Sequence, residues 1–191
     1  MRILFFLLLI SYQAVVAHDG HNDLKANPPL TGTSIYQLGS TWKNQKGDNI
    51  KLTDLKGKAQ LVVLAYTRCD TACPLVIEDL KSLASAIDSK QSEKVAVSIF
   101  SLDSLRETPE SLAAFSTKRK LPSHWALFTS DANAVSELAA VLGIRYKRLS
   151  NGDFIHSNVI YFLNKSGEIV AQKEGLKTPG AEFIKEIRNS L

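Results

Sequence analysis

The residues of this chain best suited to chemistry are its only two cysteines, Cys69 and Cys73, which three residues separate. A pair of thiols can form, break and exchange disulfides. Two thiolates with one imidazole also make a soft, three-coordinate site that suits copper. His156 is the candidate for that imidazole and His124 a weaker one, although a lone histidine is more often structural or solvated. The pair therefore indicates either thiol–disulfide chemistry or copper binding.

The spacing of the pair matches about one turn of helix, so both sulfurs can face the same side. They are then close enough to bridge when oxidised and to hold one metal ion when reduced. Pro74 fits the first turn of a helix, and a cysteine at a helix start is favoured as the thiolate. Arg68 adds a positive charge beside Cys69. A purely structural disulfide is the alternative, but the loop it closes is too short to stabilise the fold much.

The first 17 residues have the organisation of a secretory signal peptide. Arg2 supplies the positive start, an apolar run follows from Ile3 to Ile10, and small residues precede a predicted cleavage between Ala17 and His18. The apolar run is shorter than the about 20 residues of a membrane helix. We therefore expect an exported chain, soluble in the periplasm of a bacterium, with an uncleaved N-terminal anchor as the alternative.

Residues 18–33 are predicted to form a flexible segment, because Asn27, Pro28 and Pro29 disfavour regular structure. His18 and His21 lie at its start, and a free N-terminal amine with two imidazoles could bind copper(II). The alternative is a flexible terminus whose histidines have no role.

The composition indicates one domain without nucleic-acid chemistry. The 23 basic and 19 acidic residues are scattered, and Lys118–Lys120 is the only tight basic cluster of the sequence. A short cluster of this kind is typical of a helix end. Without its leader the chain is still long enough for a single hydrophobic core, and we expect a monomer.

The apolar run Leu61–Ala65 is typical of a central strand buried on both faces, and a helix from Pro74 to about Asp88 follows the cysteines. The other predicted strands are Ile35–Leu38, Ile50–Leu52, Val95–Phe100, Trp125–Phe128, Val159–Leu163 and Glu168–Gln172. Further helices are predicted after Thr108, after Ser130 or Asp131, and near Ala181. This order predicts an α/β domain of thioredoxin type over residues 34–191, with a central mixed sheet flanked by helices and an N-terminal β-hairpin.

Three segments together resemble the SCO/SenC family of copper metallochaperones. The first is Cys69-x-x-x-Cys73-Pro74 after a strand that ends in Tyr66-Thr67. The second is Ser101–Glu110, Ser-Leu-Asp-Ser-Leu-Arg-Glu-Thr-Pro-Glu, which is similar to the family's SxDPxRDTPE. The third is His156-Ser157 before Val159–Leu163 and the turn Lys165–Gly167. The resemblance extends from about Leu38 to Ile187.

The resemblance implies a thioredoxin-like fold that binds one copper ion, Cu(I) or Cu(II), through Cys69, Cys73 and His156. Asp103 and Arg106 would support the site without binding the metal. It also implies delivery of copper to a cuproprotein, the binuclear copper centre of cytochrome c oxidase. The partners would be the copper-bearing subunit of that oxidase and a thiol reductant protein, and the chain would meet a membrane only through its partner.

Two positions depart from the family pattern. Asp70-Thr71-Ala72 stands where the family often has Pro-Asp-Val, and Ile155 stands where an aspartate commonly precedes the histidine. The second change removes a charge that could fix the imidazole tautomer. Both keep open a thiol–disulfide oxidoreductase that acts on cuproprotein cysteines, with Cys69 attacking and Cys73 resolving. Peroxide reduction and a redox or copper sensor are further alternatives.

Overall fold

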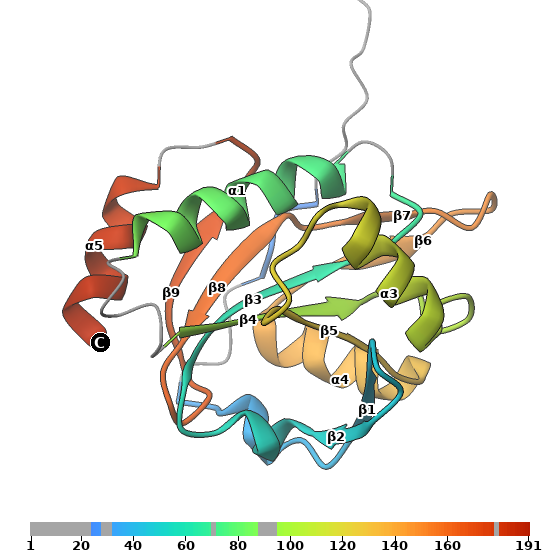
Figure 1. Cartoon of the computed structure of the whole chain (residues 1–191), viewed down its shortest axis with the longest axis horizontal. Coiled ribbons are helices and arrows are strands. Elements are labelled where there is room, and N and C mark those ends of the chain that lie inside the picture. The colour runs from blue at the N-terminus through green and yellow to red at the C-terminus, as the bar shows by residue number, and fades with distance from the viewer. Residues whose placement is uncertain (1–23, 28–31, 70–71, 88–94, 178–179) are drawn as a thin grey trace, which may run out of the picture.

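The computed structural model describes residues 24–27, 32–69, 72–87, 95–177 and 180–191. At its centre is a seven-stranded sheet with the order β2-β1-β5-β4-β3-β8-β9 (Figure 1). These strands are β1 (Thr41–Asn44), β2 (Asn49–Lys51), β3 (Ala59–Ala65), β4 (Val95–Ser101), β5 (Ala126–Thr129), β8 (Val159–Leu163) and β9 (Ile169–Glu174). A separate two-stranded ribbon pairs β6 (Tyr146–Arg148) with β7 (Phe154–His156). The predicted α/β class with a central mixed sheet is confirmed.

Strand β3 is the middle of this sheet, parallel to β4 on one side and antiparallel to β8 on the other. All of its residues are buried. Leu61 and Val63 belong to one hydrophobic core, and Val62 and Leu64 belong to the other, because successive side chains of a strand point to opposite faces. The continuous apolar run in the sequence is therefore explained by burial on both faces.

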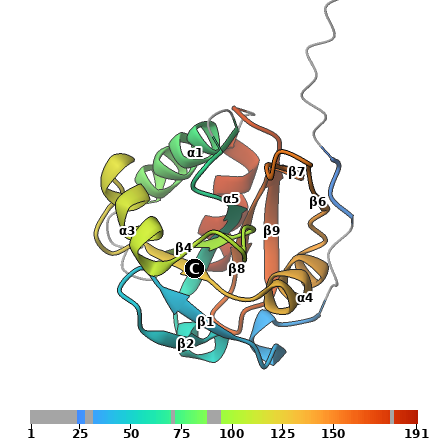
Figure 2. The same ribbon diagram turned by 90° about the vertical axis from the view of Figure 1, so that its right-hand side faces the viewer.

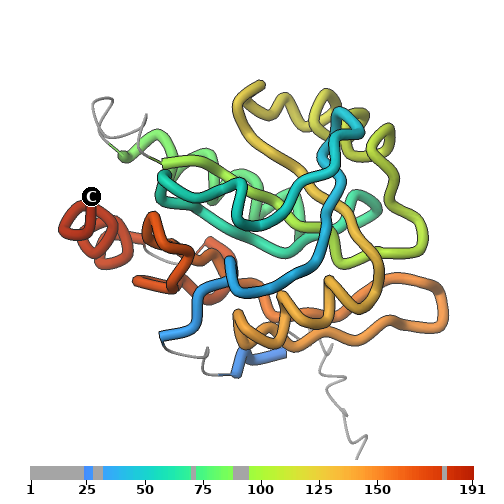
Figure 3. The backbone as a smooth tube through the Cα atoms, turned by 90° about the horizontal axis from the view of Figure 1, so that it is seen from below, coloured from blue at the N-terminus to red at the C-terminus, as the bar shows by residue number. Residues whose placement is uncertain are grey.

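The pairing of β3 brings three loops to one edge of the sheet. β3 and β4 end with Ala65 opposite Ser101, so the loops after both strands leave at the same edge. β8 runs the other way, with Gln60 opposite Leu163, so β8 begins at that edge. Figure 3 shows the loop after β4 (yellow-green) and the ribbon that precedes β8 (orange) side by side there.

Helices cover both faces of the sheet (Figure 2). The apolar sides of α1 (Ala72–Ala86), α3 (Pro109–Lys118) and α5 (Ala181–Ser190) pack into one core, and that of α4 (Ala132–Leu142) packs into the other. Leu80, Phe115 and Ile187 are the anchors of the first core, and Leu138 is an anchor of the second. This is the layered arrangement that strands alternating with helices predict.

The helices predicted after Thr108 and after Ser130 or Asp131 are present, and each begins at a side-chain cap. The Thr108 hydroxyl accepts the N–H of Ser111 (3.2 Å) at the start of α3, and the Asp131 carboxylate accepts the N–H of Ala134 (2.9 Å) at the start of α4. Gly143 ends α4 with φ 71°, a left-handed conformation that glycine adopts at little cost.

The N-terminal β-hairpin is present, but the predicted strand Ile35–Leu38 is wrong. Ile35–Gln37 forms a 3₁₀-helix instead, because the Ser34 hydroxyl accepts the N–H of Tyr36 (3.1 Å) and caps it. The hairpin is made by β1 and β2, around a turn in which the Asn44 side chain accepts two backbone N–H groups. A second 3₁₀-helix, Leu52–Leu55, leads into β3.

The ribbon of β6 and β7 was not predicted from the sequence. His156 is the last residue of β7 and lies opposite Tyr146. Three-residue strands are too short to show a periodic pattern, and Gly152, with φ 85°, forms the turn between them. His156 is therefore fixed by a strand ladder.

The predicted leader, residues 1–17, lies outside the described residues, as do His18 and His21. Within the predicted flexible segment 18–33, the N–H of Asn27 donates to the carbonyl of Gly143 (2.7 Å). No helix in the described ranges is both long enough and apolar enough to cross a membrane.

The Tyr161 hydroxyl is a buried link between the sheet and α4, because it donates to the carbonyl of Leu142 (2.6 Å). Burial raises the pKa of Tyr161, so the hydroxyl stays protonated as the donor. We expect Tyr161→Phe to lower the free energy of unfolding by about 1–2 kcal/mol, because a buried carbonyl loses its partner. Urea denaturation measures this. Tyr146→Phe, at a half-buried ring with no hydroxyl partner among the described residues, is the control and should change little.

Candidate functional site

The two cysteines lie in the connection between β3 and α1 and at the start of α1, at the edge of the sheet described above. Cys69 ends the loop after β3, and Cys73 is the second residue of α1, which begins two residues earlier than predicted. Cys69 is 5 % exposed and Cys73 is 0 % exposed. Both are thiols and are not joined in a disulfide. Both thiols are therefore shielded from bulk solvent.

The two sulfurs have different surroundings. The N–H of Cys73 donates to Sγ of Cys69 (3.2 Å), which favours negative charge on Cys69. The hydrogen bond between the two side chains raises the pKa of the Cys73 thiol well above its ordinary value, and burial raises it further. Cys69 is thus the sulfur placed to act as a thiolate, while Cys73 keeps its proton.

Tyr66 connects the cysteine loop to the ribbon. Its hydroxyl accepts the N–H of Phe154 (3.2 Å) and faces the Phe154 carbonyl at 3.5 Å. The same hydroxyl interacts with the Cys69 side chain, and burial raises the pKa of Tyr66 to about 12. The Tyr66 ring also meets the rings of Phe154 (5.2 Å between centroids) and His156 (6.3 Å) edge-on. One side chain therefore contacts both the sulfur side and the imidazole side of the site.

His156 is buried, and its tautomer follows from one hydrogen bond. Nδ1 lies 3.0 Å from the carbonyl oxygen of Ser157. A carbonyl can only accept, so Nδ1 carries the proton and Nε2 carries the lone pair of the neutral ring. Nε2 is then the nitrogen that can bind a metal. The backbone carbonyl supplies the tautomer control for which the sequence, with Ile155 before the histidine, offered no carboxylate.

The structure brings Cys69, Cys73 and His156 to the same edge of the sheet, with Tyr66 in contact with the pair and with the imidazole. Among the described residues, no three histidine, cysteine, aspartate or glutamate side chains are grouped closely enough to hold a metal ion. The two sulfurs are adjacent, and the imidazole stands apart from them.

A buried carboxyl group lies behind the cysteine loop. Oε1 of Glu107 accepts the N–H of Thr67 (2.8 Å) and its hydroxyl (2.6 Å). Oε2 is buried with no hydrogen-bond partner in the part of the chain that the structure describes. Burial raises the pKa of Glu107, although the bonds from Thr67 oppose the shift. The same carboxyl group contributes to the raised pKa of Cys73.

Asp103 and Arg106, expected as supports, form a brace between the loop after β4 and the ribbon. Nε of Arg106 donates to Oδ2 of Asp103, which is fully buried. Nη2 of Arg106 donates to the carbonyl of Gly152 at the ribbon turn. The N–H of Leu102 also donates to the carbonyl of Ala65 (2.8 Å), which ties this loop to the end of β3.

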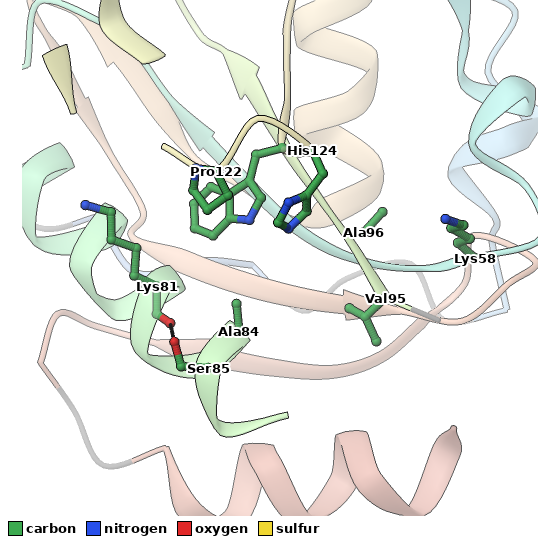
Figure 4. Close-up of a pocket in the computed structure, with 9 residues that line it drawn as sticks. Lys58, Lys81, Ala84, Ser85, Val95, Ala96, Pro122 and His124 are labelled. Atoms are coloured by element: carbon green, nitrogen blue, oxygen red, sulfur yellow. Dashed lines mark hydrogen bonds between the residues drawn. The ribbon is translucent and has the colours of Figure 1, made fainter. Parts of the chain in front are cut away.

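Arg68 is exposed beside Cys69, and His124 is exposed at the far end of the sheet. A cavity of about 680 Å³ opens at that far end, where β3 and β4 begin. Lys58, Val95 and His124 are among the residues that line it, together with the second half of α1 (Figure 4). His124 therefore lies away from the cysteines, and the structure does not bring it to the candidate site.

Sequence reasoning missed Tyr66 and the contact between Thr67 and Glu107. An aromatic residue at the end of a doubly buried strand, directly before a cysteine loop, was an available signal for Tyr66. In the sequence, Glu107 stands out only as part of the segment Ser101–Glu110. Nothing local in the sequence indicates that its carboxyl group crosses to Thr67, 40 residues away.

The fold and the site define a thioredoxin-like protein with a reduced cysteine pair at a helix start and a histidine on a neighbouring ribbon. The profile of the family described as SCO1/SenC matches residues 35–191. The chain belongs to the SCO1/SenC family. The SCO1 protein homolog of Bacillus subtilis (strain 168) is 24 % identical over 155 residues, which are 78 % of this chain and 80 % of that protein.

Solved structures show the same fold. A protein from Aquifex aeolicus VF5 has a TM-score of 0.75 at 24 % identity, covering 84 % of this chain and 94 % of that one. BsSco is described as a member of the Sco family of cytochrome c oxidase assembly proteins with a disulfide switch. Its TM-score is 0.69 at 23 % identity, and the match covers 87 % of this chain and 98 % of BsSco. Bradyrhizobium japonicum ScoI with copper bound has a TM-score of 0.66 at 22 % identity, and the match covers 79 % of this chain and 96 % of ScoI.

The buried Glu107 predicts a pH-dependent stability. Its pKa is raised on folding, so its contribution to stability is fully present below the unfolded value of about 4.5 and is lost as the pH rises through the folded value. Glu107→Gln keeps an acceptor for Thr67 without a buried charge. We expect the variant to unfold at a higher urea concentration than the wild type at pH 7, with the difference narrowing towards pH 4.

Glu110→Gln is the matched control, because Glu110 is exposed and its pKa is lowered by the Thr108 hydroxyl. That variant should gain no stability at pH 7. A Glu107→Gln protein whose stability follows that of the wild type across the whole pH range would contradict an ionised, buried carboxyl group.

Proposed function

We propose that this protein binds one copper ion through Cys69, Cys73 and His156 and delivers it to a cuproprotein, the binuclear copper centre of cytochrome c oxidase. The observation that carries the proposal is the placement of two adjacent sulfurs and, apart from them, one imidazole with its lone pair on Nε2 at the same edge of the sheet. Two sulfurs and a nitrogen are the donors that copper selects over harder cations.

The comparisons support this proposal. A structural neighbour from Bradyrhizobium japonicum has copper bound, and BsSco is described as belonging to a family of cytochrome c oxidase assembly proteins. The expected signal peptide would export the chain, to the periplasm of a bacterium. The copper-bearing subunit of the oxidase would be its partner there, and a thiol reductant protein would keep the cysteines reduced.

The chain's own residues account for how copper would be taken up. Binding releases the thiol protons, and the raised pKa of Cys73 makes its proton the harder one to remove. The imidazole must also approach the sulfurs. β6 and β7 pair only with each other, outside the seven-stranded sheet, so their displacement breaks no bond of the main ladder. Tyr66, which contacts both sides, would move with them.

The test is copper stoichiometry on the reduced protein. We expect one copper per chain, with sulfur and nitrogen ligands in X-ray absorption. Cys69→Ser, Cys73→Ser and His156→Ala should each weaken binding by more than the roughly 10- to 100-fold that loss of an outer partner costs. His124→Ala, at the far end of the sheet, should bind like the wild type. Tight binding that survives loss of both cysteines would falsify the proposal.

A second candidate function, thiol–disulfide exchange, is favoured by the unequal sulfurs. The Cys69 thiolate would attack a disulfide of a cuproprotein, form a mixed disulfide and release one thiolate of that protein. Cys73, once deprotonated, would then attack Sγ of Cys69, form the Cys69–Cys73 disulfide and release the second thiolate. Glu107, a buried carboxyl group whose charge influences Cys73, would receive that proton.

His156→Ala separates the two functions, because exchange needs only the sulfurs. If exchange is a function, the variant should lose copper yet reduce a model disulfide within about twofold of the wild-type rate, as followed by thiol release. The rate of closing the Cys69–Cys73 disulfide should rise with pH, since the raised pKa of Cys73 keeps the resolving thiol protonated at neutral pH. Equal loss of both activities in His156→Ala would reject exchange as an independent function.

A further inference from the structure

Two guanidinium groups meet over Gly152 at the turn of the β6–β7 ribbon. A Cβ placed on Gly152 would lie 2.7 Å from Nη1 of Arg106 and 3.4 Å from Nη2 of Arg148. The two positive charges therefore lie against the same small stretch of backbone, which only a glycine leaves uncovered. This cluster belongs to the same edge of the sheet as the cysteines and His156.

The Arg106 guanidinium is fixed, with one side still available. Its Nε and Nη2 are held by Asp103 and by the Gly152 carbonyl. Nη1 has no acceptor within the described part of the chain, and the side chain is 22 % exposed. A planar group held on two sides keeps its remaining N–H groups aimed in a constant direction, which lowers the entropy cost of binding a ligand there.

Arg148 lies on the same face of the ribbon as His156. Arg148 pairs with Phe154, and Tyr146 pairs with His156, so these four side chains share one face of the ribbon. Arg148 is exposed and takes part in no ion pair within 4.0 Å and no side-chain hydrogen bond in the described ranges. Lys147, which lies between Tyr146 and Arg148 in β6, points to the opposite face of the ribbon.

Neighbouring groups add apolar surface and further positive charge. Leu105, next to Arg106 in the turn after β4, is 73 % exposed, the largest exposure of a large apolar side chain among the described residues. Arg68 is exposed beside Cys69. The acid of the ribbon turn, Asp153, already accepts a hydrogen bond from Asn151 (2.8 Å). Arginine is enriched in protein-binding surfaces, and Leu105 adds exposed apolar area beside it.

We propose that Leu105, Arg106 and Arg148 form a docking site for an acidic segment of a partner protein. A carboxylate of the partner sits between the two guanidinium groups, and an apolar side chain beside it covers Leu105. Asp103 already pairs with Arg106, so Arg148 brings the positive charge that has no ion-pair partner in the described ranges, and a carboxylate of the partner offsets it. The proposal rests on the proposed function, since docking here presents the partner to the cysteines and His156.

The experiment titrates the full reduced chain with the soluble domain of the copper-bearing oxidase subunit from the same organism, by calorimetry, at low and high salt. Arg148→Glu should weaken binding at least about tenfold and reduce its salt dependence. Lys147→Glu makes the same change of charge one residue away on the opposite face and should weaken binding less than about threefold. Leu105→Ser should weaken binding with the salt dependence unchanged.

Copper content is measured on the same samples and reports on the proposed function separately. Equal weakening by Arg148→Glu and Lys147→Glu would show a diffuse charge effect and overturn the site, whatever the copper content. Absence of binding by the wild-type chain would overturn it too. Binding to phosphatidylglycerol vesicles that Arg148→Glu abolishes, with the protein titration unaffected, would replace the acidic partner by an anionic lipid.

Discussion

The burial of β3 on both faces is the constraint on which the rest of the structure depends. A strand in this position needs a neighbour on each side, and its neighbours run in opposite senses, one parallel and one antiparallel. The loop after β3, the loop after β4 and the approach to β8 consequently converge at one edge. Apart from Cys73, at the start of α1, every residue with a proposed chemical role lies on one of these three segments. The apolar run Leu61–Ala65 thus fixes where chemistry can occur before any polar residue is considered.

The sequence was most informative where a pattern is long or a local signal has a mechanism. The doubly buried strand and the capped helix starts at Thr108 and Asp131 could be predicted because each is decided by neighbours in the chain. The 3₁₀-helix at Ile35–Gln37 could not, because the apolar residues that suggest a strand are equally suited to a capped turn. The β6–β7 ribbon could not be predicted either, because it is defined by pairing across the Gly152 turn and has no periodic pattern in the sequence.

The same limit applies to the site. The cysteine pair and His156 could be picked out by residue type and family resemblance, but their surroundings come from contacts distant in sequence. Tyr66 reaches Phe154 across 88 residues, and Glu107 reaches Thr67 across 40. Such contacts surround the two sulfurs with groups that no motif records. A spacing of four residues alone would have treated Cys69 and Cys73 as equivalent.

The double role of the Tyr66 hydroxyl has a mechanical consequence. Because this one oxygen contacts both the Cys69 side chain and the backbone of Phe154, it links the cysteine loop to the ribbon. Local opening of either segment would break a contact of the other, so Tyr66 couples the cysteine loop to the ribbon. Oxidation of the sulfur or loss of its proton would therefore act on the strand that carries the histidine through the Tyr66 hydroxyl.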